Sequence, residues 1–272
     1  MSYKIYLWDN LSPIEWSQAA WRIEGTSVAA DACEGEFIHE VMLRHLPRQG
    51  LIVDAGCGTA KWPIYLRSRG YRCVGLEISH DACRMARTID PGLPVIGADL
   101  RHIPLADASV DAILSLGVVE HDEAGPLDQL RELRRILKPG GTLVIAVPFN
   151  NLFRRLIWNR LMDRVTRRRR EGNVRLGFAE YRFTQRELCG FLRATGFEPL
   201  ASYPNDLRPP KVMGLWVDYN NLFDPLSAPP GDLFVLAGWK GRIGRALVRW
   251  CPWLVCGETT IVASTKAELR ER

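Results

Sequence analysis

Short apolar runs alternate with amphipathic stretches between residues 51 and 148. The runs LIVDA, RCVGLE, PVIGAD, VDAILSLG and TLVIAVP lack a strict alternation of apolar and polar positions, which is typical of strands buried on both faces of a parallel sheet. The intervening KWPIYLRSRG, HDACRMARTI and PLDQLRELRRILKPGG have helical periodicity, and the terminal Lys-Pro-Gly-Gly predicts a helix stop followed by a turn. This order of strands and helices predicts an α/β fold with a doubly wound sheet.

The first fifty residues are expected to be helical. The stretch SPIE at residues 12–15 has the residue types of a capping box, with proline at the first helical position. A second helix is expected over residues 28–46, ending before Pro47. We therefore expect residues 1–50 to form a helical cap on the sheet.

The alternation of apolar runs and amphipathic stretches ends at about residue 148. Residues 150–165 place apolar side chains at helical spacing with arginines between them, and TRRRREGN is expected to follow as a polar loop. Thr184 and Glu187 predict a capping box for a helix that ends at Gly196. The run TTIVAS, residues 259–264, is expected to be the closing strand of the sheet.

These elements fit one domain over residues 1–272. Its expected parts are the helical cap (1–50), the core (51–150), a basic amphipathic lid insertion (151–183), the completion of the sheet (184–203 and 257–265) and an insertion on the substrate or membrane side (204–256).

Composition narrows the class of protein. The chain has 272 residues, 47% hydrophobic and 25% charged, with no apolar run long enough for a transmembrane helix and no apolar leader in its first residues. The seven cysteines are scattered and never spaced as CxxC. Reduced thiols in a cytoplasmic protein are therefore expected, and the spacing gives no support for a zinc site.

The positive charge is concentrated in one segment. The whole chain carries +5, but residues 151–186 hold eleven arginines against three acids, which leaves the rest of the chain at −3. This segment has three interpretations: a solvated helix and loop, a lid whose arginines hold an anionic substrate, or a contact with a membrane surface. Residues 236–256 support the third, because they place arginines beside tryptophan and leucine. We expect peripheral membrane contact through residues 151–170 and 236–256.

A carboxylate stands directly before the first glycine turn of the core. Gly56 and Gly58 permit a tight turn close to a ligand, but a dinucleotide fingerprint would need glycine at position 61, where Lys61 stands. Asp54 would repel a pyrophosphate at this turn. The pattern favours a ligand that is cationic or rich in hydrogen-bond donors.

Three segments in register resemble the class I S-adenosylmethionine-dependent methyltransferases. They are VDAGCGTAKWPIYLRSRGYRCVGLEIS, GADLRHIPLADASVDAILSLGVVEH and LRELRRILKPGGTLVIAVP, which together cover about residues 51–148. The likeness is to the small-molecule enzymes of type 11 and of the ubiquinone pathway. It implies a Rossmann-like sheet of seven strands with the last strand antiparallel, and S-adenosyl-L-methionine as the cofactor.

The resemblance also implies roles for the matched residues. Asp54 and the two glycines would line the methionine moiety, Glu77 would take both ribose hydroxyls, and Asp99 would accept from the adenine amino group. Leu116 and Gly117 would border the sulfonium. The positions implied for the cofactor are Asp54, Gly56, Gly58, Glu77, Ile78, Asp99, Leu100, Leu116 and Gly117.

His121 is the candidate general base. It lies just past the fourth strand of the core, beside the expected methyl donor, where a neutral imidazole can take a proton from an acceptor hydroxyl. The alternative is a helix-cap or pocket-wall residue. Glu120 and His121 lack an evident third metal ligand, so no metal is expected. Tyr181 and Arg182, in FAEYRFTQREL, are expected to face the substrate.

The sequence therefore predicts a cytoplasmic methyltransferase, placed in part at the inner membrane face, that acts on a small molecule, lipid precursor or glycan intermediate, most simply on oxygen. Three alternatives remain open. They are an RNA methyltransferase that uses the arginine-rich segment, a non-catalytic S-adenosylmethionine-binding module and a nicotinamide-dependent dehydrogenase. The absence of an RNA-binding motif argues against nucleic acid as a partner.

Overall fold

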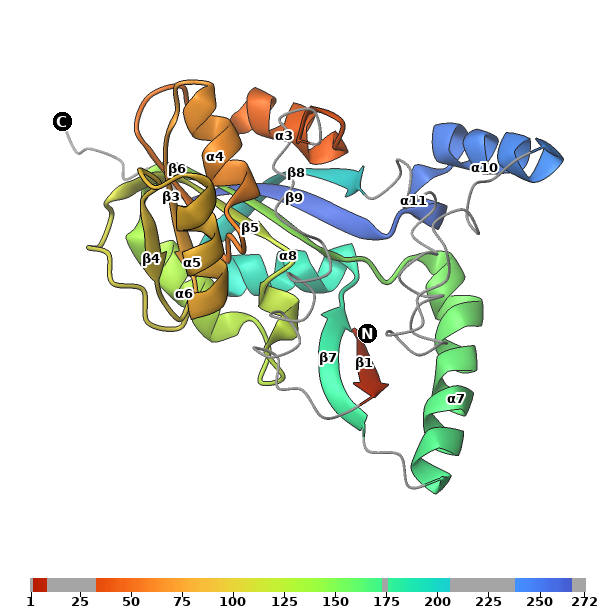
Figure 1. Cartoon of the computed structure of the whole chain (residues 1–272). Coiled ribbons are helices and arrows are strands. Elements are labelled where there is room, and N and C mark those ends of the chain that lie inside the picture. Colours follow the sequence, from red (N-terminus) through yellow and green to blue (C-terminus); the bar gives the residue numbers. More distant parts are fainter. Residues whose placement is uncertain (1, 9–32, 173–175, 206–237, 266–272) are drawn as a thin grey trace.

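A seven-stranded sheet forms the centre of the computed structural model, which describes residues 2–8, 33–172, 176–205 and 238–265 (Figure 1). The strand order is β4-β3-β2-β5-β6-β9-β8. Strand β9 is antiparallel to both of its neighbours, and the pairings among the other strands are parallel. The strands are β2 (Leu51–Ala55), β3 (Arg72–Glu77), β4 (Val95–Gly97), β5 (Val110–Leu116), β6 (Leu137–Pro148), β8 (Phe197–Asn205) and β9 (Glu258–Thr265). The predicted α/β sheet and its antiparallel closing strand are confirmed.

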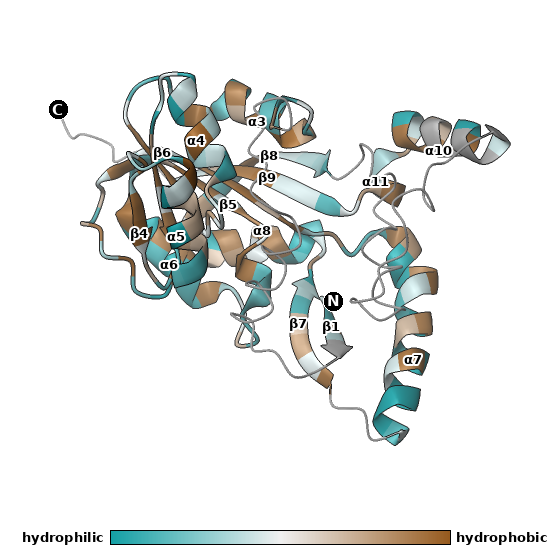
Figure 2. Ribbon diagram, in the orientation of Figure 1, coloured by the Kyte–Doolittle hydropathy of each residue, from teal (hydrophilic) through white to brown (hydrophobic). Residues whose placement is uncertain are grey.

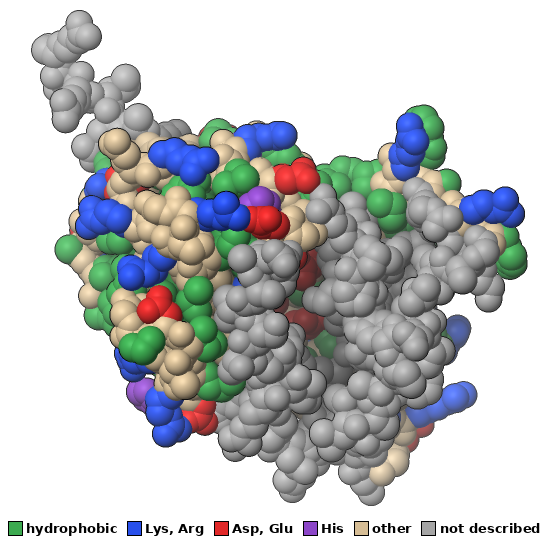
Figure 3. Space-filling model, turned by 45° about the horizontal axis from the view of Figure 1, so that its top comes forward, with side chains coloured by type: hydrophobic (Ala, Val, Ile, Leu, Met, Phe, Trp, Pro, Cys, Tyr) green, Lys and Arg blue, Asp and Glu red, His purple; other side chains and the backbone are tan. Residues whose placement is uncertain are grey.

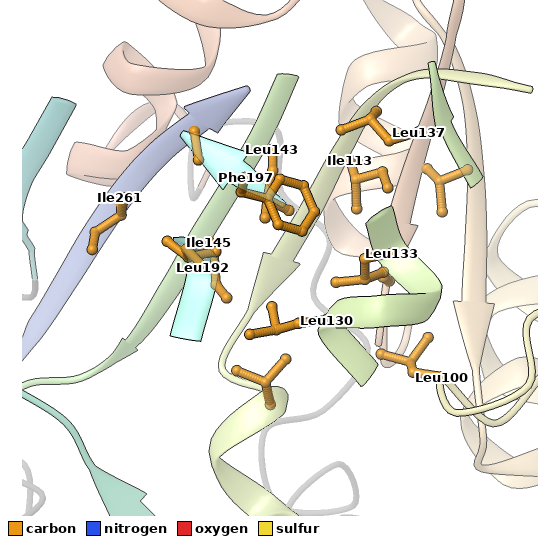
Figure 4. Packing of buried hydrophobic residues seen from close by; sticks show 14 of the residues in the cluster. Leu100, Ile113, Leu130, Leu133, Leu137, Leu143, Ile145, Leu192, Phe197 and Ile261 are labelled. Carbon is orange, nitrogen blue, oxygen red and sulfur yellow. The ribbon is translucent and has the colours of Figure 1, made fainter. Parts of the chain in front are cut away.

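Buried side chains lie on both faces of this sheet. In β5, Ile113 belongs to one core cluster and its neighbours Ala112 and Leu114 belong to another, because successive strand residues point to opposite faces. Figure 4 shows the first cluster, where leucines of the covering helices meet the strands. Helices α6 (Leu127–Ile136) and α8 (Gln185–Ala194) cover this face, and α3 (Phe37–His45) and α4 (Lys61–Ser68) cover the other. Helix α5 (His80–Ile89) packs beside α4 through a third small cluster.

A second, two-stranded sheet was not predicted. Strand β1 (Tyr3–Trp8) pairs antiparallel with β7 (Leu176–Arg182), so the expectation of helix at the start of the chain is wrong for these residues. The two strands lie far apart in sequence, and a local sequence pattern does not indicate which distant segment a strand will pair with. The predicted capping box at residues 12–15 and most of the insertion at 204–256 lie outside the described residues.

Two predicted boundaries are also corrected. Helix α7 (Asn159–Glu171), which follows a π-helical turn at Arg154–Trp158, continues through the arginine run that was expected to be a loop. Arginine is a good helix former, and its charge is favourable at a helix C-terminus. The Lys-Pro-Gly-Gly stretch lies within β6, whose pairing with β5 shifts register there. The capping box of Thr184 and Glu187 is confirmed at the start of α8.

The chain continues past β8 into two further helices near the end. Helix α10 (Gly238–Trp250) and the short α11 (Pro252–Val255) lead into β9. Figure 1 places α7 and α10 at the same end of the molecule, opposite to β4. Figure 2 shows the hydrophobic residues concentrated along the central strands, with mixed character on these outlying helices.

Candidate active site

The glycine turn after β2 is fixed against its neighbours. Gly56 has a φ of +84°, and a Cβ at this position would lie 2.5 Å from Cγ2 of Val118, so only glycine fits. The amide groups of Gly56 and Cys57 both donate to the carbonyl of Leu76, at 2.8 and 2.9 Å. The turn is therefore held to the end of β3 by backbone hydrogen bonds.

Glu77, at the end of β3, braces the same turn. Its side chain is buried, Oε2 accepts from the Gly58 amide at 2.8 Å, and Oε1 accepts from the Ser79 amide at 2.8 Å. Sequence reasoning missed this bracing, because it involves backbone groups that no motif reveals. Each carboxylate oxygen has a second lone pair, so the carboxylate retains capacity for ligand hydroxyls.

Asp54, the residue before the last of β2, is buried near Glu77. Its side chain is only 3% exposed. Burial raises the pKa of this carboxyl to about 7, and the negative charge of Glu77 adds to the shift. The ionised form is therefore costly in the protein alone, and a cation placed in this corner would stabilise it.

Asp99 follows β4 at the same edge of the sheet. Its carboxylate is paired with the guanidinium of Arg101, with Nη2 at 2.7 Å from Oδ2. The hydrogen bonds from Arg101 hold the pKa of Asp99 below its usual value. Sequence reasoning did not foresee Arg101 as a partner. Leu100 is buried next to this pair, whereas Ile78 is 43% exposed and presents an apolar surface to solvent.

The end of β5 supplies the other wall of the site. Leu116 is partly buried, and Gly117 has a φ of +70° with its amide donating to the carbonyl of Ala146. A Cβ on Gly117 would lie 3.6 Å from Oε1 of Glu120, so the Glu120 carboxyl group lies directly behind this turn. Burial raises the pKa of Glu120 to about 8.

His121 ends the 3-10 turn Val119–His121 and is oriented by β7. Its Nδ1 lies 2.7 Å from the carbonyl oxygen of Ala179, which can only accept, so Nδ1 carries the hydrogen. Burial lowers the pKa of His121, but the Glu120 and Glu180 carboxylates and the Ala179 carbonyl outweigh burial, and the net pKa is raised. The neutral ring therefore has its basic lone pair on Nε2, which lies 3.8 Å from Oε1 of Glu120.

The expected substrate residues lie on β7, which contacts the turn that carries His121. The Tyr181 hydroxyl donates to the Glu123 carbonyl at 2.9 Å, and its ring stacks on Phe183. Arg182 is fully buried, with Nε 3.2 Å from the Glu180 carboxylate. The structure therefore brings the strand that carries both residues next to the turn of His121. In the described part of the chain, no group of three or more histidine, cysteine, aspartate or glutamate side chains is arranged to hold a metal.

Comparison with known proteins identifies the class of the central domain. Residues 53–145 match the family model described as a methyltransferase domain. A malonyl-[acyl-carrier protein] O-methyltransferase of Pectobacterium atrosepticum is 33% identical over 41% of this chain and 43% of that protein. A tRNA (carboxymethyluridine(34)-5-O)-methyltransferase of Arabidopsis thaliana is 34% identical over 39% of this chain and 26% of that protein. The chain thus matches less than half of the length of these curated relatives.

Solved structures agree on the fold. A methyltransferase from Methanosarcina mazei, described as S-adenosylmethionine-dependent, gives a TM-score of 0.58 at 19% identity, covering 84% of this chain and 98% of that one. A putative methyltransferase in complex with the Haloferax volcanii Trm112 activator gives 0.58 at 20% identity, covering 95% and 99%. Residues 53–145 thus match a methyltransferase domain and the solved structures share its fold, which agrees with the resemblance to the class I S-adenosylmethionine-dependent methyltransferases.

Replacing Gly56 by alanine tests the close packing of the turn. We expect Gly56→Ala to lower the free energy of unfolding by roughly 3 kcal/mol or more, from left-handed strain together with the collision with Val118. Gly70→Ala is the matched control, because Gly70 has a similar φ of +82° with no atom within 4 Å of an added Cβ. Urea denaturation measures both. Equal losses would show that Val118 yields and that the turn is not tightly packed.

Burial of Asp54 predicts an inverse pH dependence of stability. A carboxyl pKa of about 7 in the folded protein lies above the unfolded value of about 3.9, so stability is lost as pH rises through the folded pKa. We expect Asp54→Asn to recover on the order of 4 kcal/mol at pH 8 and little below pH 4. Thermal unfolding across this range measures the effect, with exposed Asp128→Asn as the control. A gain that is the same at every pH would contradict the shifted pKa.

Proposed function

We propose that this protein binds S-adenosyl-L-methionine and transfers its methyl group to an oxygen of a small molecule, lipid precursor or glycan intermediate. The observation that carries the proposal is the pair of buried carboxylates at the ends of β2 and β3, beside a glycine turn that is already formed. Such a corner suits a cationic nucleoside and repels a diphosphate. The methyltransferase-domain match over residues 53–145 supports the same conclusion.

The chemistry of the site residues fits this cofactor. Asp54, with its raised pKa, is placed to ionise against the ammonium group, and the turn at Gly56 allows the methionine moiety to approach the backbone. Glu77 offers its remaining lone pairs to the ribose hydroxyls. Asp99 and exposed Ile78 lie at the edge where the adenine ring would be held. These roles follow the positions that the sequence resemblance implies.

When bound, S-adenosyl-L-methionine supplies a methyl group that its sulfonium has already activated. The protein then has to align an acceptor, exclude water and remove one proton. His121 is suited to the last task, because the Ala179 carbonyl fixes the hydrogen on Nδ1 and leaves Nε2 basic. Glu120 lies buried behind Gly117 with Oε1 3.8 Å from Nε2, and its charge when ionised raises the pKa of His121. Strand β7, which carries Tyr181 and Arg182, contacts the turn of His121, and this supports a role for these two residues on the acceptor side of the site.

The nature of the acceptor is supported by a relative. The Pectobacterium atrosepticum protein is named as an O-methyltransferase of a malonyl group on acyl-carrier protein, which favours oxygen as the methylated atom here. The Arabidopsis thaliana relative is named as a tRNA O-methyltransferase, and the arginines of residues 151–186 give an RNA acceptor as the second candidate. RNA would co-purify with the protein and bind with an affinity that falls steeply with salt.

The cofactor assignment predicts losses of binding at two positions. Asp54→Ala and Glu77→Ala should each weaken S-adenosylhomocysteine binding by about tenfold or more, because each removes a charge-assisted acceptor. Isothermal calorimetry measures the dissociation constants, and Asp128→Ala on the exposed face of α6 is the control. Unchanged affinity in both variants would refute the site. Binding of NADH in place of S-adenosylhomocysteine would favour a dehydrogenase.

The role of His121 predicts a separation of turnover from binding. His121→Ala should lower kcat by about 10²-fold or more with little change in S-adenosylhomocysteine affinity. In the unmodified protein, kcat should rise with pH to a plateau, with a midpoint above the ordinary histidine value of about 6.5, because the pKa of His121 is raised. Equal losses of turnover and affinity would instead make His121 a wall of the pocket.

The acceptor class can be identified directly. Incubating the protein with host extract and methyl-labelled S-adenosyl-L-methionine, followed by fractionation, should place the label in lipid, polar metabolite or glycan. Label in RNA would favour the second candidate. Cofactor binding with no transfer to any fraction would favour a non-catalytic binding module.

A further inference from the structure

Exposed large hydrophobic residues gather on two outlying helices. Of the ten in the described residues, seven lie between residues 152 and 161 or on α10. The first group is Leu152, Leu156, Ile157 and Leu161, and the second is Trp239, Ile243 and Trp250. Scattered single residues of this kind are normal on a soluble protein, whereas a gathered set marks a contact surface.

The helix that begins at the π turn has two distinct faces. Arg154, Asn159 and Met162 are buried against the rest of the protein. The opposite face is apolar in its first half, where Leu156 and Ile157 are more than half exposed. Its second half is basic, because Arg160, Arg164, Arg167 and Arg168 are all exposed. One exposed face therefore combines an apolar end with a cationic end.

Helix α10 repeats this combination. Trp239, Ile243 and Trp250 are exposed at helical spacing, with exposed arginines at 242 and 249 between them. The Arg249 guanidinium lies 5.4 Å from the ring centroid of Trp250, which is 75% exposed. The helix carries four basic residues and no acidic one. Figure 3 shows basic and hydrophobic side chains side by side on this outlying helix.

Buried hydrogen bonds join the segment that precedes α7 to the segment that follows α11. Nη1 of Arg154, in the π turn before α7, donates to the carbonyl of Gly257 at 2.7 Å. Nδ2 of Asn151 donates to the carbonyl of Cys256 at 2.9 Å, just after α11. Phe149 also contacts Trp253 of α11, with ring centroids 5.7 Å apart. The segment before α7 is thus bonded to the segment after α11, which contacts α10, and α7 and α10 lie at the same end of the molecule (Figure 1).

We propose that the exposed faces of α7 and α10 dock this protein on the surface of an anionic lipid bilayer. We call these faces the docking surface: Leu152, Leu156, Ile157, Leu161, Arg160, Arg164, Arg167, Arg168, Trp239, Arg242, Ile243, Arg249 and Trp250. Arginines attract acidic headgroups, and leucine, isoleucine and tryptophan enter the boundary between headgroups and acyl chains. No helix in the described part of the chain is long and apolar enough to cross a membrane.

The apolar side chains decide between a bilayer and RNA as the occupant. Both ligands offer phosphates to arginine, but a phosphate backbone provides no place for Leu156 and Ile157. A bilayer takes up both kinds of side chain together, and tryptophan is favoured at its interface. The alternating arrangement on α10 fits a helix lying in the plane of the surface. This inference does not depend on the proposed methyl transfer.

Vesicle flotation tests the docking surface in the full-length protein. The protein should float with vesicles of phosphatidylcholine containing phosphatidylglycerol and remain at the bottom with phosphatidylcholine alone. Binding should weaken as salt rises, because screening reduces the attraction of arginine to the headgroups. No flotation with anionic vesicles at low salt would overturn the proposal.

Two sets of variants separate the apolar from the cationic part. Leu156→Ser with Ile157→Ser, and Arg160→Glu with Arg164→Glu, should each reduce partitioning to anionic vesicles by about tenfold or more. Leu200→Ser and Arg44→Glu change exposed residues on β8 and α3 and should float as the unmodified protein does. Circular dichroism and S-adenosylhomocysteine affinity should be unchanged in all variants, which separates loss of docking from loss of fold or cofactor site.

Two outcomes would contradict the bilayer specifically. Retained flotation in the serine variant together with binding of single-stranded RNA would assign the surface to nucleic acid. Concentration-dependent dimerisation in solution, lost in the serine variant, would assign it to a second copy of this chain.

Discussion

The site depends on keeping two carboxylates buried next to one another at the ends of parallel strands. Asp54 is the residue before the last of β2, and Glu77 is the last of β3. The two strands pair in parallel with Asp54 opposite Gly75, so both carboxylates lie near the same edge of the sheet. Glu77 accepts hydrogen bonds there from two backbone amides, whereas burial raises the pKa of Asp54 to about 7 and so disfavours its ionised form. Ionising the buried Asp54 therefore costs free energy in the protein alone, and a cation bound next to it would offset that cost.

Strand order explains why the remaining site residues converge on this corner. The chain moves from β2 to β3 and β4 on one side and returns to β5 on the other, so β2 and β5 flank the point where the order reverses. Ligands of open α/β sheets bind outside the carboxyl ends at such a point. Gly56 packs directly on Val118, which connects the turn after β2 to the turn that carries His121. A cofactor and an acceptor would thus meet between two turns that are already in contact.

Local patterns predicted the strands of the central sheet, including the closing strand, and the acids at the strand ends, because each depends on residues close in sequence. The antiparallel direction of the closing strand was implied by the resemblance to a known family, since its pairing with β6 joins distant segments. Long-range contacts decided the rest. The pairing of β1 with β7 joins distant segments, and the Ala179 carbonyl that orients His121 lies 58 residues away. Arg101 pairs with Asp99, and the Tyr181 hydroxyl donates to the Glu123 carbonyl; no signal in the sequence indicated either partner. Helix α7 continues through the arginine run because arginine has a high helix propensity, whereas the charge of this run had led us to expect a loop.

Proton release on cofactor binding tests the central claim most directly. Calorimetric titration of S-adenosylhomocysteine in buffers of different ionisation enthalpy reports the number of protons exchanged. If a cation ionises Asp54, binding at pH 7 should release about half a proton per site, and Asp54→Asn should abolish the release. Tight binding that releases no proton from the unmodified protein, or the same release from the Asp54→Asn variant, would contradict the account.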